Sequence, residues 1–124
     1  MVVDASAIAA VLLVESNAKE VAARIADRKL TAPTLLAFEF ANVCSIKARR
    51  FPDKIDSLFE ALHSFERLAI TLLPVDMLGV FELAGRTGLT AYDASYLWLA
   101  LERNAELVTL DARLGRAYSA AMLG

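Results

Sequence analysis

The chain has 124 residues, enough for one domain that buries roughly two-thirds of the surface its unfolded chain would expose. Its composition is 57% hydrophobic, but its longest apolar run, residues 7–14, is too short to cross a bilayer and follows no basic segment, which argues against a membrane span and a signal peptide. The net charge of −2 at first argues against nucleic acid as a partner, although the remainder would be net positive if four of the acids belonged to one metal site.

The chain carries one cysteine, Cys44, and one histidine, His63. A single cysteine forms no intrachain disulfide and no cysteine zinc cluster, and a single histidine excludes most histidine-rich metal sites. We expect a cytoplasmic protein with a single domain over residues 1–124, whose excess apolar surface goes into a core and a subunit interface.

Short apolar strands are predicted to alternate with helices along the chain. In chain order these are a strand at residues 1–3, a helix from about residue 6, a helix at 17–27, a strand at 29–32, a helix at 33–50, a helix at 53–67, a strand at 68–75, a helix from Asp76 to Gly85 or Gly88, a helix at 90–104, a strand at 107–110 and a final helical segment.

Capping and breaking residues set several of these boundaries. Asn17, with Glu20 three residues later, is typical of a helix start. Pro33 is expected to open a helix that Pro52 ends, and Asp76 can cap the helix that follows it.

The alternation of strands and helices indicates an α/β fold with a parallel sheet covered on both faces. Ligands in such folds bind beyond the carboxyl ends of the strands. Asp4 and Asp111 each stand at the carboxyl end of a predicted strand, which is a first indication of function.

Two further acids lie on apolar helix faces. On a helical wheel Glu39 falls about 40° from Leu35, inside a stripe that also includes Ile46 and, one turn later, Asn42. Asp93 heads a similar stripe that continues through Tyr96, Leu97, Ala100 and Leu101. An unpaired buried carboxylate costs several kcal/mol, so such acids are usually paired, protonated or bound to a cation.

Each acid also has a structural explanation. Asp4 can cap the first helix, Asp93 can be the acid of a capping box after Thr90, and Asp111 can begin a turn. Glu39 can pair with a buried arginine, although helices rarely place a glutamate within an apolar stripe.

Taken together, the four acids indicate a metal site. Asp4 and Asp111 stand at the ends of strands, and Glu39 and Asp93 lie near helix N-termini on inward faces. All four can therefore converge at one end of the sheet. Four carboxylates without matching cations would raise one another's pKa values and destabilise the fold, and a divalent cation removes that conflict. Oxygen ligands without histidine or cysteine favour Mg²⁺ or Mn²⁺ over zinc.

The segments VVDASA, EFANV, YDASYLWLA and LVTLDARL resemble the PIN-domain ribonucleases, and most closely the VapC-type toxins of prokaryotic toxin–antitoxin pairs. The resemblance covers nearly the whole chain, in the family's order and near its usual spacing. It implies a PIN-like three-layer α/β/α sandwich with a short central parallel sheet. It also implies a catalytic quartet that binds the metal, formed by Asp4, Glu39, Asp93 and Asp111. The supporting residues that it implies are Ser6, Asn42 and Thr109.

The resemblance further implies an activity and partners. The protein is expected to be a Mg²⁺-dependent endoribonuclease, with Mn²⁺ able to substitute, that leaves 5′-phosphate and 3′-hydroxyl ends. A bound divalent ion would lower the pKa of a water molecule and shield the phosphodiester charge. The expected partners are RNA, a VapB-type antitoxin and a second copy of the chain. Many relatives end with an additional edge strand, and the segment of this chain after Asp111 is short for such a strand.

Three other classes of protein fit the sequence less well. A catalytically idle PIN-like binding or dimerisation module has no reason to retain four clustered carboxylates. A haloacid-dehalogenase-type phosphatase requires a second aspartate where this chain has Ser6. A receiver domain requires adjacent acids after the first strand and a late lysine, and no lysine follows Lys54.

The remaining surface features are less specific. The face of the 33–50 helix opposite Glu39 is apolar and is predicted to pack against a second subunit or an antitoxin; it comprises Phe38, Phe40, Ala41 and Cys44. Two sets of basic side chains have more than one possible role: they can bind RNA phosphates or an acidic partner, or they can simply be solvated. One set is the cluster Lys47, Arg49, Arg50 and Lys54, and the other is the dispersed Arg86, Arg103, Arg113 and Arg116.

Overall fold

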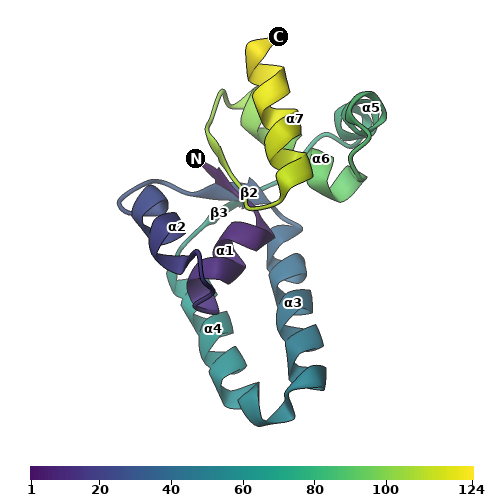
Figure 1. Cartoon of the computed structure of the whole chain (residues 1–124). Helices are drawn as coiled ribbons and strands as arrows, with labels where there is room; N and C mark the ends of the chain where they lie inside the picture. The colour runs from purple at the N-terminus through teal and green to yellow at the C-terminus, as the bar shows by residue number, and fades with distance from the viewer.

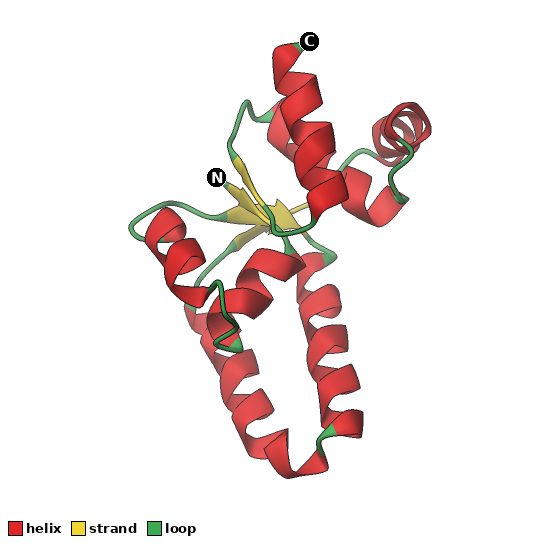
Figure 2. Cartoon of the chain, viewed as in Figure 1, coloured by secondary structure: helices red, strands yellow, loops and turns green.

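A computed structural model describes all residues, 1–124, and has a four-stranded parallel sheet between two layers of helices (Figures 1 and 2). This is the three-layer α/β/α architecture that the sequence predicts. In chain order the elements are β1 (Val2–Val3), α1 (Ala5–Leu12), α2 (Ala18–Ile25), β2 (Thr31–Pro33), α3 (Leu36–Arg50), the 3₁₀ helix η1 (Pro52–Lys54), α4 (Ile55–Arg67), β3 (Thr71–Leu73), α5 (Met77–Thr87), α6 (Ala91–Glu102), β4 (Leu107–Val108) and α7 (Ala112–Leu123).

The sheet has the strand order β3-β2-β1-β4, with β1 in its interior. Val2 pairs with Thr31 of β2 and Leu107 of β4, and Val3 pairs with Val108. Both valines of β1 are fully buried, as expected for a parallel strand with helices on both faces. Because all four strands run the same way, the segments that follow them emerge at one edge of the sheet.

Helices α5, α6 and α7 lie on one side of the sheet and α1 to α4 on the other (Figure 1). Helix α6 packs across β1, β2 and β4, while α1 packs against α2, α3 and α4. Helices α3 and α4 form a long hairpin that extends away from the sheet, with η1 at its tip (Figure 1). Helix α3 follows β2 closely, so its first turn lies near the edge where the strands end.

The apolar face of α3 that contains Phe40 belongs to the core, which corrects the interface predicted from the sequence. Phe40 is 0% exposed and stacks on Phe65 of α4 with 5.4 Å between ring centroids, and Cys44 is buried beside them. Burying a phenylalanine stabilises the fold by about 2–3 kcal/mol. Of the predicted interface residues only Phe38 and Ala41 are exposed, because α4 covers the rest of that face.

The capping signals mark most helix boundaries correctly. Asp76 begins α5 by accepting a hydrogen bond from the Gly79 N–H at 2.9 Å, and Gly88, with a φ of 75°, ends the same helix. Asn17 precedes α2 as predicted, but its side chain makes no capping hydrogen bond.

Pro33 does not open a helix, which corrects the predicted boundaries of the second strand and the third helix. It is the last residue of β2 and pairs with Leu73 of β3, and α3 begins only at Leu36. Pairing with the neighbouring strand keeps the backbone of Pro33 extended. Pro52 behaves as predicted, since α3 ends just before it.

After β4 the chain forms α7 and adds no further strand to the sheet. None of the helices has both the length and the apolar character needed to cross a membrane.

Candidate functional site

Asp4 directly follows β1 and caps α1. Its Oδ1 accepts hydrogen bonds from the Ala7 N–H at 3.0 Å and the Ser6 hydroxyl at 2.7 Å, and its Oδ2 accepts one from the Thr109 hydroxyl. The residue is only 5% exposed. Burial raises the pKa of Asp4 above its ordinary value, the three hydrogen bonds oppose this change, and the nearby Asp111 adds to it.

Ser6 and Thr109 connect the end of β1 to the end of β4. The Ser6 hydroxyl accepts a hydrogen bond from the Leu110 N–H at 2.9 Å, and the Thr109 hydroxyl accepts one from the Asp111 N–H at 3.0 Å. Asp111 then caps α7, because its Oδ1 accepts a hydrogen bond from the Leu114 N–H at 2.9 Å. The two hydroxyls therefore hold Asp4 and the backbone of Asp111 in a fixed relation.

Glu39 lies in the first turn of α3 and is held by Tyr96 of α6. The Tyr96 hydroxyl donates a hydrogen bond to Glu39 Oε1 at 2.5 Å, and the tyrosine is 1% exposed. Burial raises the pKa of Glu39, the hydrogen bond from Tyr96 lowers it, and the charges of Asp93 and Asp4 raise it further. Burial and the bond to Glu39 also raise the pKa of Tyr96, so its hydroxyl keeps its proton and remains a donor.

Asp93 lies in the first turn of α6, where its N–H donates to the Thr90 hydroxyl at 3.1 Å. This is one of the two bonds of the predicted capping box; the Asp93 carboxylate does not accept the other from the Thr90 N–H. Burial raises the pKa of the half-buried Asp93, the charges of Asp111 and Asp4 raise it further, and the guanidinium of Arg113 lowers it.

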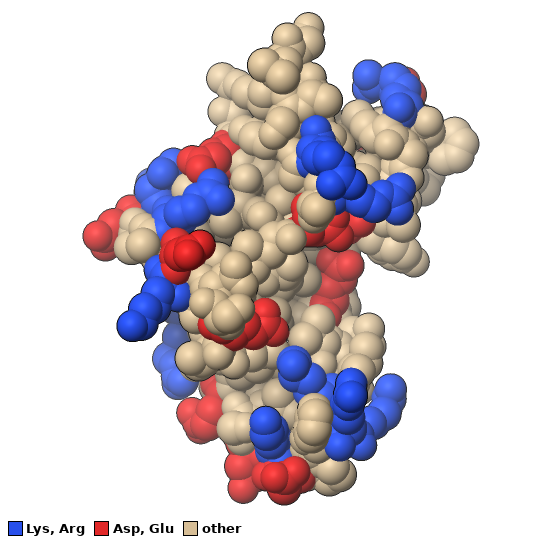
Figure 3. All heavy atoms as spheres, in the orientation of Figure 1, with Lys and Arg blue, Asp and Glu red and all other residues tan.

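The acids predicted to form the quartet thus come from four separate elements to the same edge of the sheet, where they influence one another electrostatically. None of them forms an ion pair, whereas four glutamates elsewhere do: Glu60, Glu66, Glu82 and Glu106. Acidic side chains gather on the visible face between α1, α3 and the start of α7 (Figure 3). The site is a concentration of negative charge held by neutral hydroxyl and amide donors.

The atoms of this site that could bind a metal are oxygen atoms of carboxylates and hydroxyls, and Mg²⁺ and Mn²⁺ prefer oxygen ligands. No three of the acids lie close enough together to form a ready-made cation-binding group. The residues therefore fit a divalent cation in their chemistry, and coordinating one requires the carboxylates to draw closer.

Asn42 is the one predicted supporting residue outside this network. Its side chain is exposed and makes no hydrogen bond to another residue. The helical face that contains Glu39 is not the core face of α3, since Ile46 on the same stripe is 54% exposed. The core instead takes the stripe of Leu36, Phe40 and Cys44.

Tyr96 belongs to the candidate site, although the sequence pattern indicates only a core residue. It lies three residues after Asp93, which places it on the same side of α6 as that acid. A hydroxyl on an otherwise apolar, inward stripe was the signal that could have identified it, because a buried tyrosine hydroxyl needs a partner.

Comparisons with known proteins agree with this architecture. The family model of the PIN domain matches residues 1–119. The chain is 41% identical to Ribonuclease VapC9 of Mycobacterium tuberculosis, over 92% of this chain and 87% of that protein. It is 33% identical to Ribonuclease VapC3 of Pyrobaculum aerophilum, over 97% of this chain and 95% of that protein.

Among solved structures, the crystal structure of PAE2754 from Pyrobaculum aerophilum superposes with a TM-score of 0.77. The superposition covers 98% of this chain and 91% of that chain, with 23% sequence identity. At this identity the comparison shows that the two proteins share a fold. The family model and the extent of identity together establish the relationship: this chain belongs to the PIN domain family, and within it to the VapC type.

Proposed function

We propose that the protein is a Mg²⁺- or Mn²⁺-dependent endoribonuclease that acts in the cytoplasm as the toxin of a toxin–antitoxin pair. The relatives VapC9 and VapC3 are both named ribonucleases. The observation that carries the proposal is the convergence of acids from four elements, Asp4, Glu39, Asp93 and Asp111, none of which forms an ion pair.

In this proposal the four carboxylates hold the divalent ion, which when bound activates water and shields the charge of the phosphodiester. The chain's own residues orient the ligands. Ser6 and Thr109 fix Asp4, and Tyr96 fixes one oxygen of Glu39 so that the other is free. Asn42, one turn after Glu39, is a further candidate for contacting the ion or the RNA.

The test is incubation of the purified protein with total RNA in Mg²⁺, in Mn²⁺ and in EDTA, with the cut ends mapped. We expect internal cleavage that leaves 5′-phosphate and 3′-hydroxyl ends and that stops in EDTA. Cleavage that persists in EDTA would refute the metal-dependent mechanism. A protein that binds RNA or a partner but never cuts RNA would instead be an idle binding module.

The proposed partners are RNA, a VapB-type antitoxin and a second copy of the chain. An antitoxin tail that offers arginine or lysine to the carboxylates would compete with the metal and so inhibit the enzyme. For the homodimer, the apolar surface lies along α5 and the start of α6, where Met77, Phe81 and Tyr92 are exposed beside a groove of about 410 Å³. This surface replaces the Phe40 face predicted from the sequence.

A further inference from the structure

We propose that Arg113 and Arg116 of α7 form a binding site for a backbone phosphate of the RNA, next to the phosphate that is cut. This inference rests on the proposed function. It assigns the positioning of the substrate to two residues that the sequence left ambiguous.

The two arginines share one side of α7. They are three residues apart, so their side chains lie one above the other on the helix. Together with Thr87, Leu89 and Ala117 they line a hollow of about 320 Å³, and no acid lines it. An anion in this hollow would meet two guanidinium groups and no carboxylate among the residues that line it.

The position of Arg113 is fixed by the backbone. Its Nη2 donates a hydrogen bond to the Gly88 carbonyl oxygen at 2.9 Å. Gly88 ends α5 just before Thr90 caps α6, so Arg113 links the start of α7 to the start of the helix that carries Asp93. A guanidinium has five N–H donors, and one bond to Gly88 leaves the others for a ligand.

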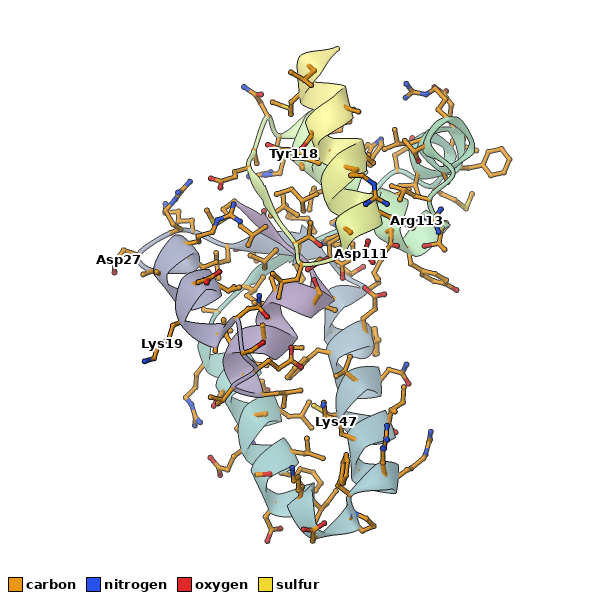
Figure 4. All side chains as sticks on the ribbon, viewed as in Figure 1. Lys19, Asp27, Lys47, Asp111, Arg113 and Tyr118 are labelled. Atoms are coloured by element: carbon orange, nitrogen blue, oxygen red, sulfur yellow. The ribbon has the colours of Figure 1, made fainter.

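Neither arginine is neutralised by a neighbouring acid. The arginines that do form ion pairs lie elsewhere, at Arg24, Arg28, Arg67 and Arg86. Arg113 is close enough to lower the pKa of Asp93, yet no acid stands within ion-pair distance of it. Cationic side chains lie directly beside acidic ones where α7 meets α6 (Figure 3), and Asp111 and Arg113 are neighbours at the start of α7 (Figure 4).

This arrangement suits a polyanion that extends past the carboxylate site. The acids repel RNA until a cation is bound, so the adjoining phosphates need separate positive contacts. Arginine offers a planar fork of donors that matches a phosphate, and contacts of this kind set the register of the nucleic acid without reading its sequence. RNA is favoured over an acidic peptide because the hollow adjoins the site where a phosphodiester is cut.

The test measures RNA affinity against salt concentration in a Glu39→Gln background, which removes a proposed catalytic acid on α3 and leaves α7, the helix that carries both arginines, unchanged. The variants are Arg113→Gln, Arg116→Gln and the matched control Arg103→Gln. Arg103 is also exposed and unpaired, but it caps the opposite end of α6. The probe is a short labelled single-stranded RNA, followed by fluorescence anisotropy between about 50 and 200 mM salt.

Because the site holds one phosphate, we expect each of the two site variants to lower the slope of log affinity against log salt by up to about 0.7 and to weaken binding up to about fivefold at 0.1 M salt, while Arg103→Gln changes neither. Slopes equal to that of the control overturn the inference, as does weaker binding with an unchanged slope, which indicates a structural loss alone. Displacement by an acidic peptide but not by unlabelled RNA would assign the hollow to a protein partner and also overturn it. Cleavage of total RNA by the wild-type protein separates failure of this inference from failure of the proposed function.

Discussion

The acids of the site are oriented by neutral donors. Asp4 accepts hydrogen bonds from two hydroxyls and one N–H, and Glu39 accepts one from Tyr96. A neutral donor fixes a carboxylate without cancelling its charge, whereas an arginine would do both. The negative charge therefore remains available to a cation, and the residues that fix its geometry are as important to the proposed site as the acids.

The hydroxyl of Tyr96 is expected to matter for metal binding. Tyr96→Phe keeps the buried ring but frees Glu39 to rotate, and loss of such an outer partner typically costs about tenfold in metal affinity. Calorimetric titration with Mn²⁺ measures this change. Tyr118→Phe is the matched control, since the Tyr118 hydroxyl donates a hydrogen bond of 3.3 Å to the Ala105 carbonyl oxygen and not to any of the acids. Equal Mn²⁺ affinities for the two variants would contradict the role assigned to Tyr96.

Asp93→Asn separates a catalytic role from a capping role. We expect it to abolish RNA cleavage and to leave the free energy of unfolding unchanged or higher, because it removes one of several repelling charges. Asp76→Ala is the control: it removes a cap at the start of α5 and should cost about 1 kcal/mol without affecting cleavage. Melting curves and cleavage assays on both variants decide the matter. Loss of stability with full activity in Asp93→Asn would show that the acid is only structural.

The raised pKa values predict how stability depends on pH. Asp4, Glu39 and Asp93 bind protons more readily in the folded protein than in the unfolded chain, whose aspartate and glutamate pKa values are 3.8 and 4.5. Stability from these groups is therefore greatest at low pH and falls as the pH rises above about 4 through the raised values. Urea unfolding in EDTA across this range should show a shallower fall for Asp93→Asn than for the wild type. Parallel curves for the two proteins would argue against coupling among the acids.

At the scale of the element, the contact between α5 and α6 depends on one small residue. A Cβ at Gly79 would lie 2.5 Å from Trp98 Nε1 and 3.0 Å from Asp76 Oδ2, so α6 approaches the start of α5 as closely as glycine allows. Two turns further along α5, a Cβ at Gly85 would meet nothing within 4 Å. The two glycines of one helix therefore have different reasons for being there.

These two sites form a matched pair of substitutions. Gly79→Ala is expected to destabilise the protein by about 1–3 kcal/mol, because Trp98 must move. Gly85→Ala is expected to stabilise it by about 0.5–1 kcal/mol through helix propensity alone. Chemical denaturation of both variants provides the measurement. Equal effects of the two substitutions would mean that the approach of α6 to α5 is not tight.

At the scale of the whole molecule, the outer surface of α5 is an apolar area left without a covering layer. Phe81 is 78% exposed and Met77 77% exposed, and α5 lies at the edge of the fold (Figure 1). A stable homodimer buries about 1,000 Å² or more in total, and an exposed aromatic residue near the centre of such a patch often contributes most of the affinity.

If the proposed homodimer forms through this surface, Phe81→Ser is expected to convert it to a monomer without loss of the fold. Val14→Ser is the control, since Val14 is 80% exposed but follows α1 and does not belong to α5 or α6. Light scattering at tens of micromolar gives the mass, and melting curves check the fold. A wild-type monomer, or a dimer that survives Phe81→Ser, would refute this interface.

Much of the fold, and the set of candidate site residues, could be predicted from local sequence. Short β-rich apolar segments alternating with helical patterns indicate a parallel sheet, and Asp4 and Asp111 stand at strand ends whatever the packing. Capping chemistry is local too, so Asp76, Thr90 and Gly88 marked their helix ends correctly. The four acids could be selected because charge within apolar patterns is unfavourable unless something compensates it.

Other features were decided only by tertiary packing. Helix α3 has two apolar stripes, and the placement of α4 determined that Phe40 and Cys44 enter the core while the stripe of Ile46 faces solvent. Pairing with β3 kept Pro33 in a strand, and the approach of α6 to α3 gave Glu39 its tyrosine partner. Local sequence sets which residues favour burial, a turn or a cap, but contacts between elements distant in the chain decide which of several apolar faces is covered and which polar groups meet.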